Sequence, residues 1–252
     1  KFLQNANGPG IEWTNNGPQV SAAIKNAAGI QSQYQYLLSQ KQINSTWPIN
    51  HEQPVVIEII AGKNKLLDKQ QLNDLLLQNK VSPDALYQWE NHYLIFGKAP
   101  DVFVLKERIR KAFPGTQVKE YDDLFYEFNR IHCDDKKVTK EWDHVLLTAN
   151  LVTDPKLQKE YLDYHATQFE KWPEVAAGFC RADFQQLLLF RNGRQLILVI
   201  SIPKGESLDK LNPKTTENNP RVDEWNLRMK KYQEGIPGTK PGEVWVFLKA
   251  IK

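Results

Sequence analysis

Residues 184–203 constrain the fold most, because they predict a β-hairpin. They read FQQLLLFRNGRQLILVISIP, two apolar runs joined by Asn192 and Gly193. A two-residue turn of this kind needs positive φ angles, which Asn and Gly adopt at low cost. Two neighbouring strands are therefore expected to pair here, and their apolar side chains must be covered by helices or by a second sheet.

A strand and a helix precede this hairpin, and a helix and a strand follow it. The first strand is predicted over residues 144–152 and the first helix over 154–171, where Asp154 suits the N-cap and Pro155 the first helical position. After a polar insertion, PRVDEWNLRMKKYQ predicts a second helix and GEVWVFLKAIK a closing strand. The predicted order is β-α-β-β-α-β.

The same order is predicted earlier in the chain. PVVIEIIA is a strand, LDKQQLNDLLLQN a helix, and ALYQWENHYLIFG a hairpin turning at Asn91 and His92. DVFVLKERIRKAF is a second helix, and TQVKEY with DLFYEFNRI supplies the closing strand or strands. The chain is thus predicted to be α+β, with two ferredoxin-like units in tandem at residues 53–133 and 142–252. Two such sheets commonly pack into a dimeric α/β barrel, and here one chain supplies both halves.

Residues 1–52 differ from the rest. Turn-rich stretches, NANGPG and TNNGPQ, are followed by VSAAIKNAAGIQSQYQYLLSQKQ, whose apolar residues recur at helical spacing. The sequence predicts an extension with one helix and no core of its own. NSTWPINHEQP then reads as a linker, since its prolines prevent a helix from continuing.

Composition and charge exclude several function classes. The formal net charge is +3, and basic residues alternate with acidic ones, so neither nucleic acid nor a membrane surface is expected as a partner. No apolar run is long enough to span a bilayer. The chain begins at Lys1 without Met, which allows either a cytoplasmic protein or an exported one that has lost a signal peptide. Cys133 and Cys180 are expected to be buried free thiols rather than a pair.

Most of the histidines offer no sign of chemistry. The sequence contains no Gly-rich phosphate loop, no GxSxG, no HExxH and no His/Cys cluster with metal-ligand spacing. Four histidines lie in predicted linkers, turns or element ends and are expected at the surface: His51, His92, His132 and His144.

His165 is different, because it lies one helical turn after Tyr161. Their side chains share one face of the predicted helix, so both polar tips can reach one ligand. An imidazole titrates near neutrality and can give or take a proton, while a phenol can fix a hydroxyl group. The alternative is an aromatic stripe that faces the core and tolerates a hydrogen-bonded histidine.

The second predicted helix carries Trp225 and Met229 four residues apart. This spacing is typical of a buried apolar stripe. It also suits a sugar site, because the C–H faces of a sugar stack on indole rings while its hydroxyls bind polar groups.

These stretches together resemble the L-rhamnose mutarotase family. That family has Tyr-x-x-x-His followed by Trp-Pro-Glu, and later Asn-Pro, a Trp pair, Met and a KPGE-V strand. The matching residues are Tyr161, His165, Trp172-Pro173-Glu174, Asn219-Pro220, Trp225, Met229 and Lys240-Pro241-Gly242-Glu243. The resemblance covers about residues 142–252.

The resemblance implies an isomerase that interconverts the α and β anomers of L-rhamnose or a related monosaccharide without a cofactor or metal. It implies that His165 is the proton donor and that Tyr161 and Trp225 contact the sugar. Trp172 and Asn226 are further candidates for sugar binding, and Asn226 stands where the family has the second Trp of its pair. An internal pseudo-dimer would let the chain work as a monomer.

The chain departs from the family pattern in ways that keep other functions open. The segment between His165 and Trp172 is about three residues longer than in the family. The family's second sugar-binding Tyr has no match either, since the corresponding strand carries only Phe184 and Phe190 as aromatic residues. The first unit lacks Tyr-x-x-x-His and is predicted to carry no site. The alternatives are a non-catalytic carbohydrate-binding or structural relative, and another small α/β-barrel chemistry such as cofactor-free monooxygenation or haem binding.

Overall fold

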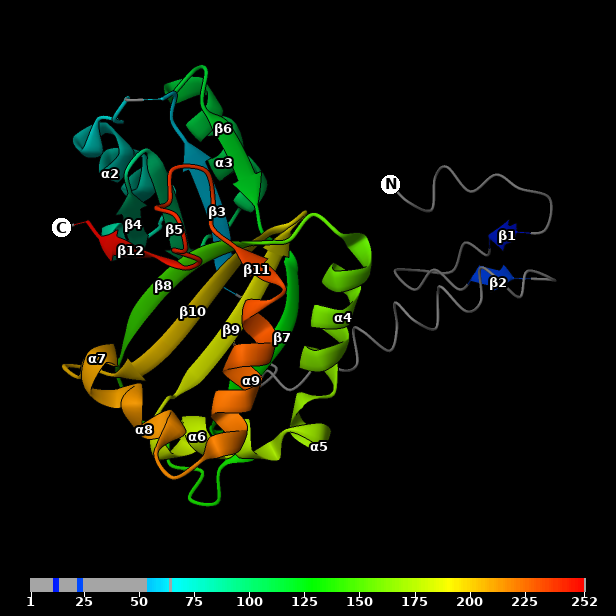
Figure 1. The fold of residues 1–252 in the computed structure, drawn as a ribbon. Coiled ribbons are helices and arrows are strands. Elements are labelled where there is room, and N and C mark those ends of the chain that lie inside the picture. Colours follow the sequence, from blue (N-terminus) through cyan, green and yellow to red (C-terminus); the bar gives the residue numbers. More distant parts are fainter. Residues whose placement is uncertain (1–10, 14–21, 25–53, 64, 252) are drawn as a thin grey trace. The chain divides into compact units, whose positions relative to one another are not determined.

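The computed structural model describes residues 11–13, 22–24, 54–63 and 65–251 (Figure 1). The chain divides into one unit at residues 1–52 and a second at residues 53–252. In the first unit β1 (Ile11–Trp13) pairs antiparallel with β2 (Ala22–Ile24). The helix predicted for this extension lies outside the described residues, apart from the stretch that forms β2.

The second unit is a mixed α+β structure built on one curled antiparallel sheet of ten strands. Its first half contains β3 (Val55–Ile60), α2 (Lys69–Gln78), β4 (Leu86–Trp89), β5 (His92–Gly97), α3 (Val102–Ala112) and β6 (Gln117–Glu120). A short 3₁₀ turn at Pro83–Ala85 precedes β4. Another, at Arg130–His132, follows β7 (Asp123–Asn129).

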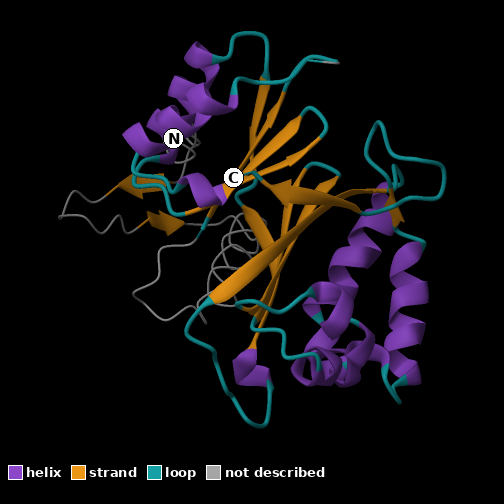
Figure 2. Ribbon diagram, turned by 90° about the vertical axis from the view of Figure 1, so that its left-hand side faces the viewer, coloured by secondary structure: helices purple, strands orange, loops and turns teal. Residues whose placement is uncertain are grey.

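The second half supplies the other strands and most helices. In chain order these elements are β8 (Trp142–Leu151), α4 (Pro155–Ala166), α5 (Gln168–Lys171), α6 (Pro173–Arg181), β9 (Gln186–Asn192), β10 (Gln195–Pro203), α7 (Leu208–Leu211), α8 (Pro213–Thr216), α9 (Pro220–Lys230), β11 (Gln233–Glu234) and β12 (Val246–Ala250). Figure 2 shows these helices on one side of the strands, away from α2 and α3.

The strand order is β6-β3-β5-β4-β12-β8-β10-β9-β7, with β11 beside β8. Two segments pass from one half of the sheet to the other. β6 pairs with β3, and only two residues later β7 pairs with β9. β12 pairs first with β8 and then, at Lys249 and Ala250, with β4. The closing segments predicted for each unit are therefore shared between the halves.

The strongest predicted hairpin is confirmed. Asn192 pairs with Gln195 across the turn, and Gly193 has a φ of 59°. The earlier hairpin turns one residue sooner than predicted, because Glu90 adopts the positive φ (48°) and Trp89 pairs with His92. His92 is thus the first residue of β5 and is buried, so its predicted surface role is wrong.

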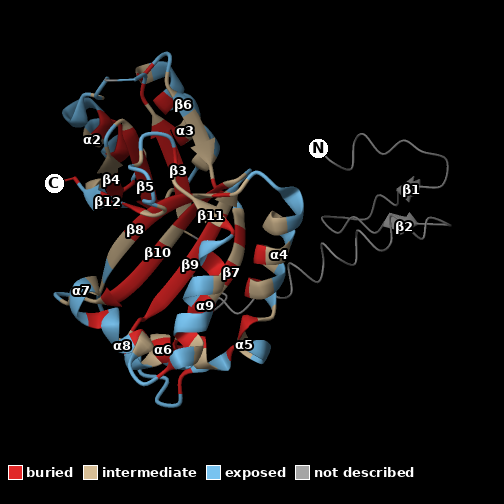
Figure 3. Cartoon of the chain, in the orientation of Figure 1, coloured by how far each residue is buried: buried red, intermediate tan, exposed pale blue. Residues whose placement is uncertain are grey.

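The helices cover the outer face of the sheet, and Figure 3 shows the strands as the most buried part of the fold. Around α2 and α3 the core includes Ile57, Ile59, Leu72, Leu76, Leu105 and Ile109. Under α4 to α9 there are two clusters. One is rich in Leu, Ile and Phe, and the other contains most of the aromatic residues of α4 and α9. The second of these clusters holds the candidate site.

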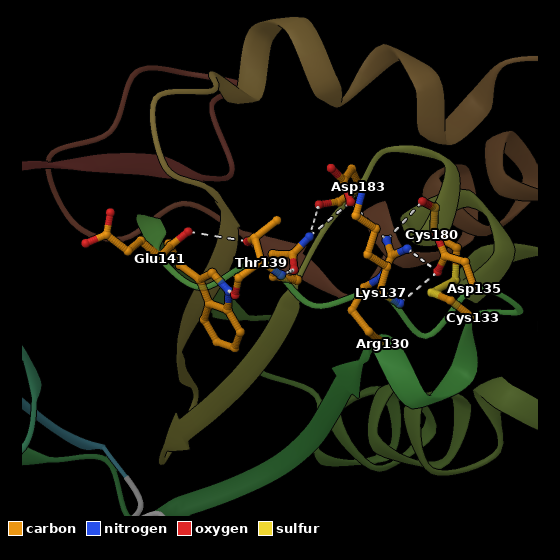
Figure 4. A network of polar contacts seen from close by, with 10 residues as sticks. Arg130, Cys133, Asp135, Lys137, Thr139, Glu141, Cys180 and Asp183 are labelled. Carbon is orange, nitrogen blue, oxygen red and sulfur yellow. Dashed lines mark hydrogen bonds and ion pairs between the residues drawn. A yellow bond between two sulfur atoms is a disulfide. The ribbon is translucent and has the colours of Figure 1, made fainter.

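A disulfide and a buried arginine fix the end of β7 against α6 (Figure 4). Cys133 and Cys180 are bonded, with Cα atoms 5.6 Å apart, so the expectation of free thiols is wrong. Spacing in sequence could not reveal this pair, because 47 residues separate the two cysteines. Arg130 pairs with Asp135 (2.5 Å) and Asp183 (3.3 Å) and also donates to the Cys180 carbonyl.

Within the part of the chain that the structure describes, no helix combines the length and apolar character needed to cross a membrane.

Candidate functional site

The helix α4 that carries Tyr161 and His165 begins as predicted. The Asp154 side chain accepts a hydrogen bond from the Lys156 amide, and Pro155 occupies the first turn. The helix ends sooner than predicted, at Ala166, and α5 starts at Gln168. Thr167 between them donates its hydroxyl to the Asp163 carbonyl, a local bond that competes with helical pairing.

His165 lies inside a ring of aromatic side chains from three elements. The distances from its ring centroid are 4.2 Å to Tyr161, 5.1 Å to Tyr126, 5.3 Å to Trp225 and 5.8 Å to Phe125. Only 6% of the histidine is exposed. The sequence-predicted pair therefore faces α9 and β7, and its surroundings are aromatic rather than aliphatic.

The hydrogen bond of the His165 imidazole fixes which nitrogen can accept a proton. Nδ1 lies 2.9 Å from the Tyr161 carbonyl oxygen, which can only accept, so Nδ1 carries the hydrogen. Nε2 has no hydrogen-bond partner among the described residues. Burial lowers the pKa of His165 to about 4, although the bond to the carbonyl opposes this shift. His165 is therefore neutral near pH 7 and presents a lone pair on Nε2.

The Tyr161 hydroxyl accepts a hydrogen bond from a residue on a strand. Gln233, on β11, donates from Nε2 to the Tyr161 oxygen at 3.2 Å. The side-chain oxygen of Gln233 accepts a bond from Trp245 Nε1 at 3.1 Å. Burial raises the pKa of Tyr161, so the phenol keeps its proton at neutral pH.

A second phenol reaches His165 from β7, and sequence reasoning missed it. Tyr126 donates to Gln168 Oε1 at 2.8 Å, and Gln168 Nε2 donates to the Trp172 carbonyl at 2.7 Å. β7 alternates in burial along DLFYEFN, which marks Tyr126 as inward-facing. The pattern could not show which sheet β7 joins. Phe184, by contrast, stacks on Phe179 in the neighbouring core cluster.

The two tryptophans lie together beside the histidine. Trp172 and Trp225 are both buried, with ring centroids 5.5 Å apart. The Arg221 guanidinium lies over the Trp172 ring at 3.9 Å, an arrangement in which the cation is attracted to the ring face. Asn226 is exposed on α9, because one residue along a helix turns the side chain away from the face of Trp225. The structure thus brings together four of the five predicted site residues.

These groups offer a proton acceptor, phenols and indole faces within one cluster. The described residues contain no group of three or more His, Cys, Asp or Glu side chains that could hold a metal ion. A hollow of about 300 Å³ between α2, β4 and the end of β12 is lined by Lys69, Gln88, Glu90, Lys249, Ala250 and Ile251. It shares no residue with the cluster around His165.

Comparison with known proteins agrees with the position of this cluster. A family model described as L-rhamnose mutarotase matches residues 144–251. An L-fucose mutarotase of Xanthomonas campestris pv. campestris is 32% identical over 97 residues, which cover 38% of this chain and 75% of that protein. The chain belongs to the L-rhamnose mutarotase family.

Membership in this mutarotase family rests on the second half, where α4, α9 and β12 lie. A UPF0734 protein of Dictyostelium discoideum is 29% identical over 117 residues, 45% of this chain and 85% of that protein. Among solved structures, a putative chlorite dismutase aligns with 79% of this chain and 95% of its own, with a TM-score of 0.35 and 10% identity.

Proposed function

We propose that the protein is a sugar mutarotase that interconverts the α and β anomers of L-rhamnose or a related 6-deoxy sugar such as L-fucose. One observation supports this most: within the family-matched half, the lone pair on His165 Nε2 and the Tyr161 hydroxyl lie one helical turn apart. Opening a hemiacetal ring needs such a pair, one group that removes the proton of the anomeric hydroxyl and one that protonates the ring oxygen.

In the proposed reaction, His165 Nε2 accepts the proton of the anomeric hydroxyl while Tyr161 gives its proton to the ring oxygen. The C1–O5 bond breaks and an open-chain aldehyde forms. Because the departing alkoxide is much more basic than a phenolate, a phenol suffices as the acid. Rotation about C1–C2 then presents the other face of the carbonyl. On closure O5 attacks C1, Tyr161 recovers its proton, and His165 returns its proton to the anomeric oxygen.

This assignment gives His165 both roles in turn. Its low pKa keeps Nε2 unprotonated at neutral pH and so free to accept the proton in ring opening, and the imidazolium so formed is the donor for ring closure, as microscopic reversibility requires. The proton-donor role implied by the family resemblance is then the second half of the same cycle. Trp225 and Trp172 supply the indole faces on which the sugar stacks.

The architecture we propose is an internal pseudo-dimer of two ferredoxin-like units. Both halves have the same strand order. Counted along the chain and without the short β11, the four strands of each half lie in the order fourth, first, third, second: β6-β3-β5-β4 and β12-β8-β10-β9. The strand segments β6–β7 and β12 each pair with both halves, as expected where two such sheets close on one another. One chain would then suffice for a complete barrel, with the catalytic cluster in the second half only.

The test is NMR saturation transfer between the α and β anomeric protons of L-rhamnose and of L-fucose. We expect exchange above the buffer rate with the native protein. A protein that binds either sugar but leaves exchange at the buffer rate would be a non-catalytic carbohydrate-binding relative. The deep enclosure of His165, which is only 6% exposed, favours this second candidate.

A further inference from the structure

Two consecutive hydrogen bonds, both pointing in the same direction, end at the Tyr161 hydroxyl. Trp245 Nε1 donates to Gln233 Oε1 at 3.1 Å, and Gln233 Nε2 donates to the Tyr161 oxygen at 3.2 Å. The three side chains come from the segment before β12, from β11 and from α4. β11 consists of two residues that pair with the end of β8, and this pairing fixes where Gln233 projects.

The chemistry of the three groups sets the direction of this chain. An indole N–H can only donate, so it selects the oxygen of the Gln233 amide. The amide nitrogen, which can only donate, must then face Tyr161. The Tyr161 oxygen is left as the acceptor of this bond, and its single hydrogen points elsewhere. That hydrogen has no acceptor among the described residues.

We propose that Gln233 and Trp245 are positioning residues that hold Tyr161 as a hydrogen-bond donor to the ring oxygen of the sugar. The inference rests on the proposed mutarotase function. A ring oxygen carries lone pairs and no hydrogen, so it can be recognised and protonated only by a donor. A phenol free to rotate would often present a lone pair instead. The chain Trp245–Gln233–Tyr161 removes that unproductive orientation before the sugar binds.

The variant Gln233→Glu tests the direction of the chain without changing its shape. A carboxylate accepts from Trp245 as before, but it also accepts from Tyr161 and so turns the phenolic hydrogen away from the sugar. We expect kcat for anomer exchange to fall on the order of 10²-fold, the lower range for a positioned acid, with a much smaller change in KM. Gln71→Glu, an exposed change in the first turn of α2, is the matched control and should leave exchange unchanged.

A double-mutant cycle separates positioning from a general structural effect. If Gln233 acts only through Tyr161, then Tyr161→Phe and the double variant Tyr161→Phe/Gln233→Glu lose the same activity. Independent, multiplying losses would overturn the inference. Exchange by Gln233→Glu within about twofold of an active native protein would overturn it too, since a positioned acid contributes far more.

A native protein without mutarotase activity can be told apart from an error in the role of Gln233. If the native protein does not accelerate exchange, the same variants are compared for binding of L-rhamnose and L-fucose. A loss of affinity in Gln233→Glu that Tyr161→Phe reproduces would still support the orientation of the hydroxyl, whereas unchanged affinity in both would overturn it.

Discussion

Two buried histidines, one on a strand of the first half and one on a helix of the second, have different hydrogen-bond partners. His92, at the start of β5, places Nδ1 2.8 Å from a carboxylate oxygen of Glu58. His165, on α4, places Nδ1 2.9 Å from a backbone carbonyl and is otherwise surrounded by aromatic rings. The first histidine has a charged partner, and the second has none among the described residues. Neither imidazole has a hydrogen bond at Nε2 among the described residues, but the ring of His165 lies against phenols, with Tyr161 at 4.2 Å and Tyr126 at 5.1 Å, whereas the ring of His92 lies against Trp89.

Both carboxylate oxygens of Glu58 have partners. Its two carboxylate oxygens receive bonds from His92 at 2.8 Å, Tyr121 at 2.7 Å and Gln195 at 3.0 Å, and Lys119 Nζ lies 3.5 Å away. Burial alone would raise the pKa of this carboxyl, but the bond from His92 and the charge of Lys119 outweigh it, so the pKa lies below its usual value.

The Glu58 cluster also joins the two halves of the sheet. Gln195, on β10, accepts from Lys119 at 2.6 Å and donates to Glu58, which lies on β3. A charge with all its hydrogen bonds satisfied contributes to the structure but is poorly suited to react. The His165 cluster leaves a lone pair and a hydroxyl hydrogen unpaired, which is the expected arrangement where a ligand completes the hydrogen bonds.

The largest effect is expected from Glu58→Ala. Removing the carboxylate leaves the charge of Lys119 and the donors of His92, Tyr121 and Gln195 without their partner, so the free energy of unfolding should fall by about 3–5 kcal/mol. Urea unfolding measures this. Glu206→Ala, which removes an exposed pair with Lys210, is the control and should leave the free energy of unfolding nearly unchanged, because solvent screens exposed ion pairs. A loss below ~1 kcal/mol for Glu58→Ala would contradict the structural role of the cluster.

The clusters around His165 and Glu58 should lose their contributions to folding stability in different ranges of acid pH. His165 has a pKa of about 4 in the folded state and about 6.5 when unfolded, so the unfolded state binds the proton more readily. Stability should therefore fall as the pH drops from 6.5 to 4, by about 3 kcal/mol. Glu58, whose pKa is lowered by folding, stabilises the fold above its unfolded pKa and loses this contribution below it, as the pH falls towards its folded value.

Urea unfolding at several pH values in native protein and in His165→Gln measures this separation. The variant should lose the slope between pH 6.5 and 4 and keep the loss of stability at lower pH that Glu58 causes. A slope that persists unchanged in His165→Gln would show that other groups cause it.

Tyr126→Phe should have an intermediate effect. Removing the hydroxyl leaves Gln168 Oε1 buried without its donor, which costs about 1–3 kcal/mol of folding stability. Thermal and urea unfolding measure the loss. Tyr164→Phe is the comparison, because its hydroxyl accepts from Arg228 near the surface, and we expect a change within about 0.5 kcal/mol. Equal losses in both variants would contradict the buried bond.

The smallest effect is expected from Asn226→Ala. Its side chain is exposed on α9, on the side away from the cluster, so stability should change by no more than about 0.5 kcal/mol and anomer exchange should be unaffected. Trp225→Ala, one residue earlier, should reduce sugar affinity. If Asn226→Ala weakened sugar binding as strongly as Trp225→Ala does, the outer face of α9 would belong to the site.

Local patterns in the sequence predicted α2, α3, α4 and α9, the Asn192–Gly193 hairpin and the closeness of Tyr161 and His165, but not α6, nor α7 and α8 within the polar insertion. They could not predict contacts made across long separations. Tyr126 reaches His165 only because β7 leaves β6 and joins β9. His92 is buried because the hairpin turns one residue earlier than expected and Glu58 lies opposite. Neither the Cys133–Cys180 bond nor the hydrogen bond from Gln233 to Tyr161 has a local signature in the sequence.

The most direct test of the account is the pH dependence of L-rhamnose and L-fucose anomer exchange in native protein and in His165→Ala. We predict exchange above the buffer rate that persists from neutral pH down to about 4, declines below it as Nε2 is protonated, and is abolished in His165→Ala. Exchange that survives in His165→Ala, or an activity that appears only when His165 is protonated, would contradict the role of a neutral imidazole as the base.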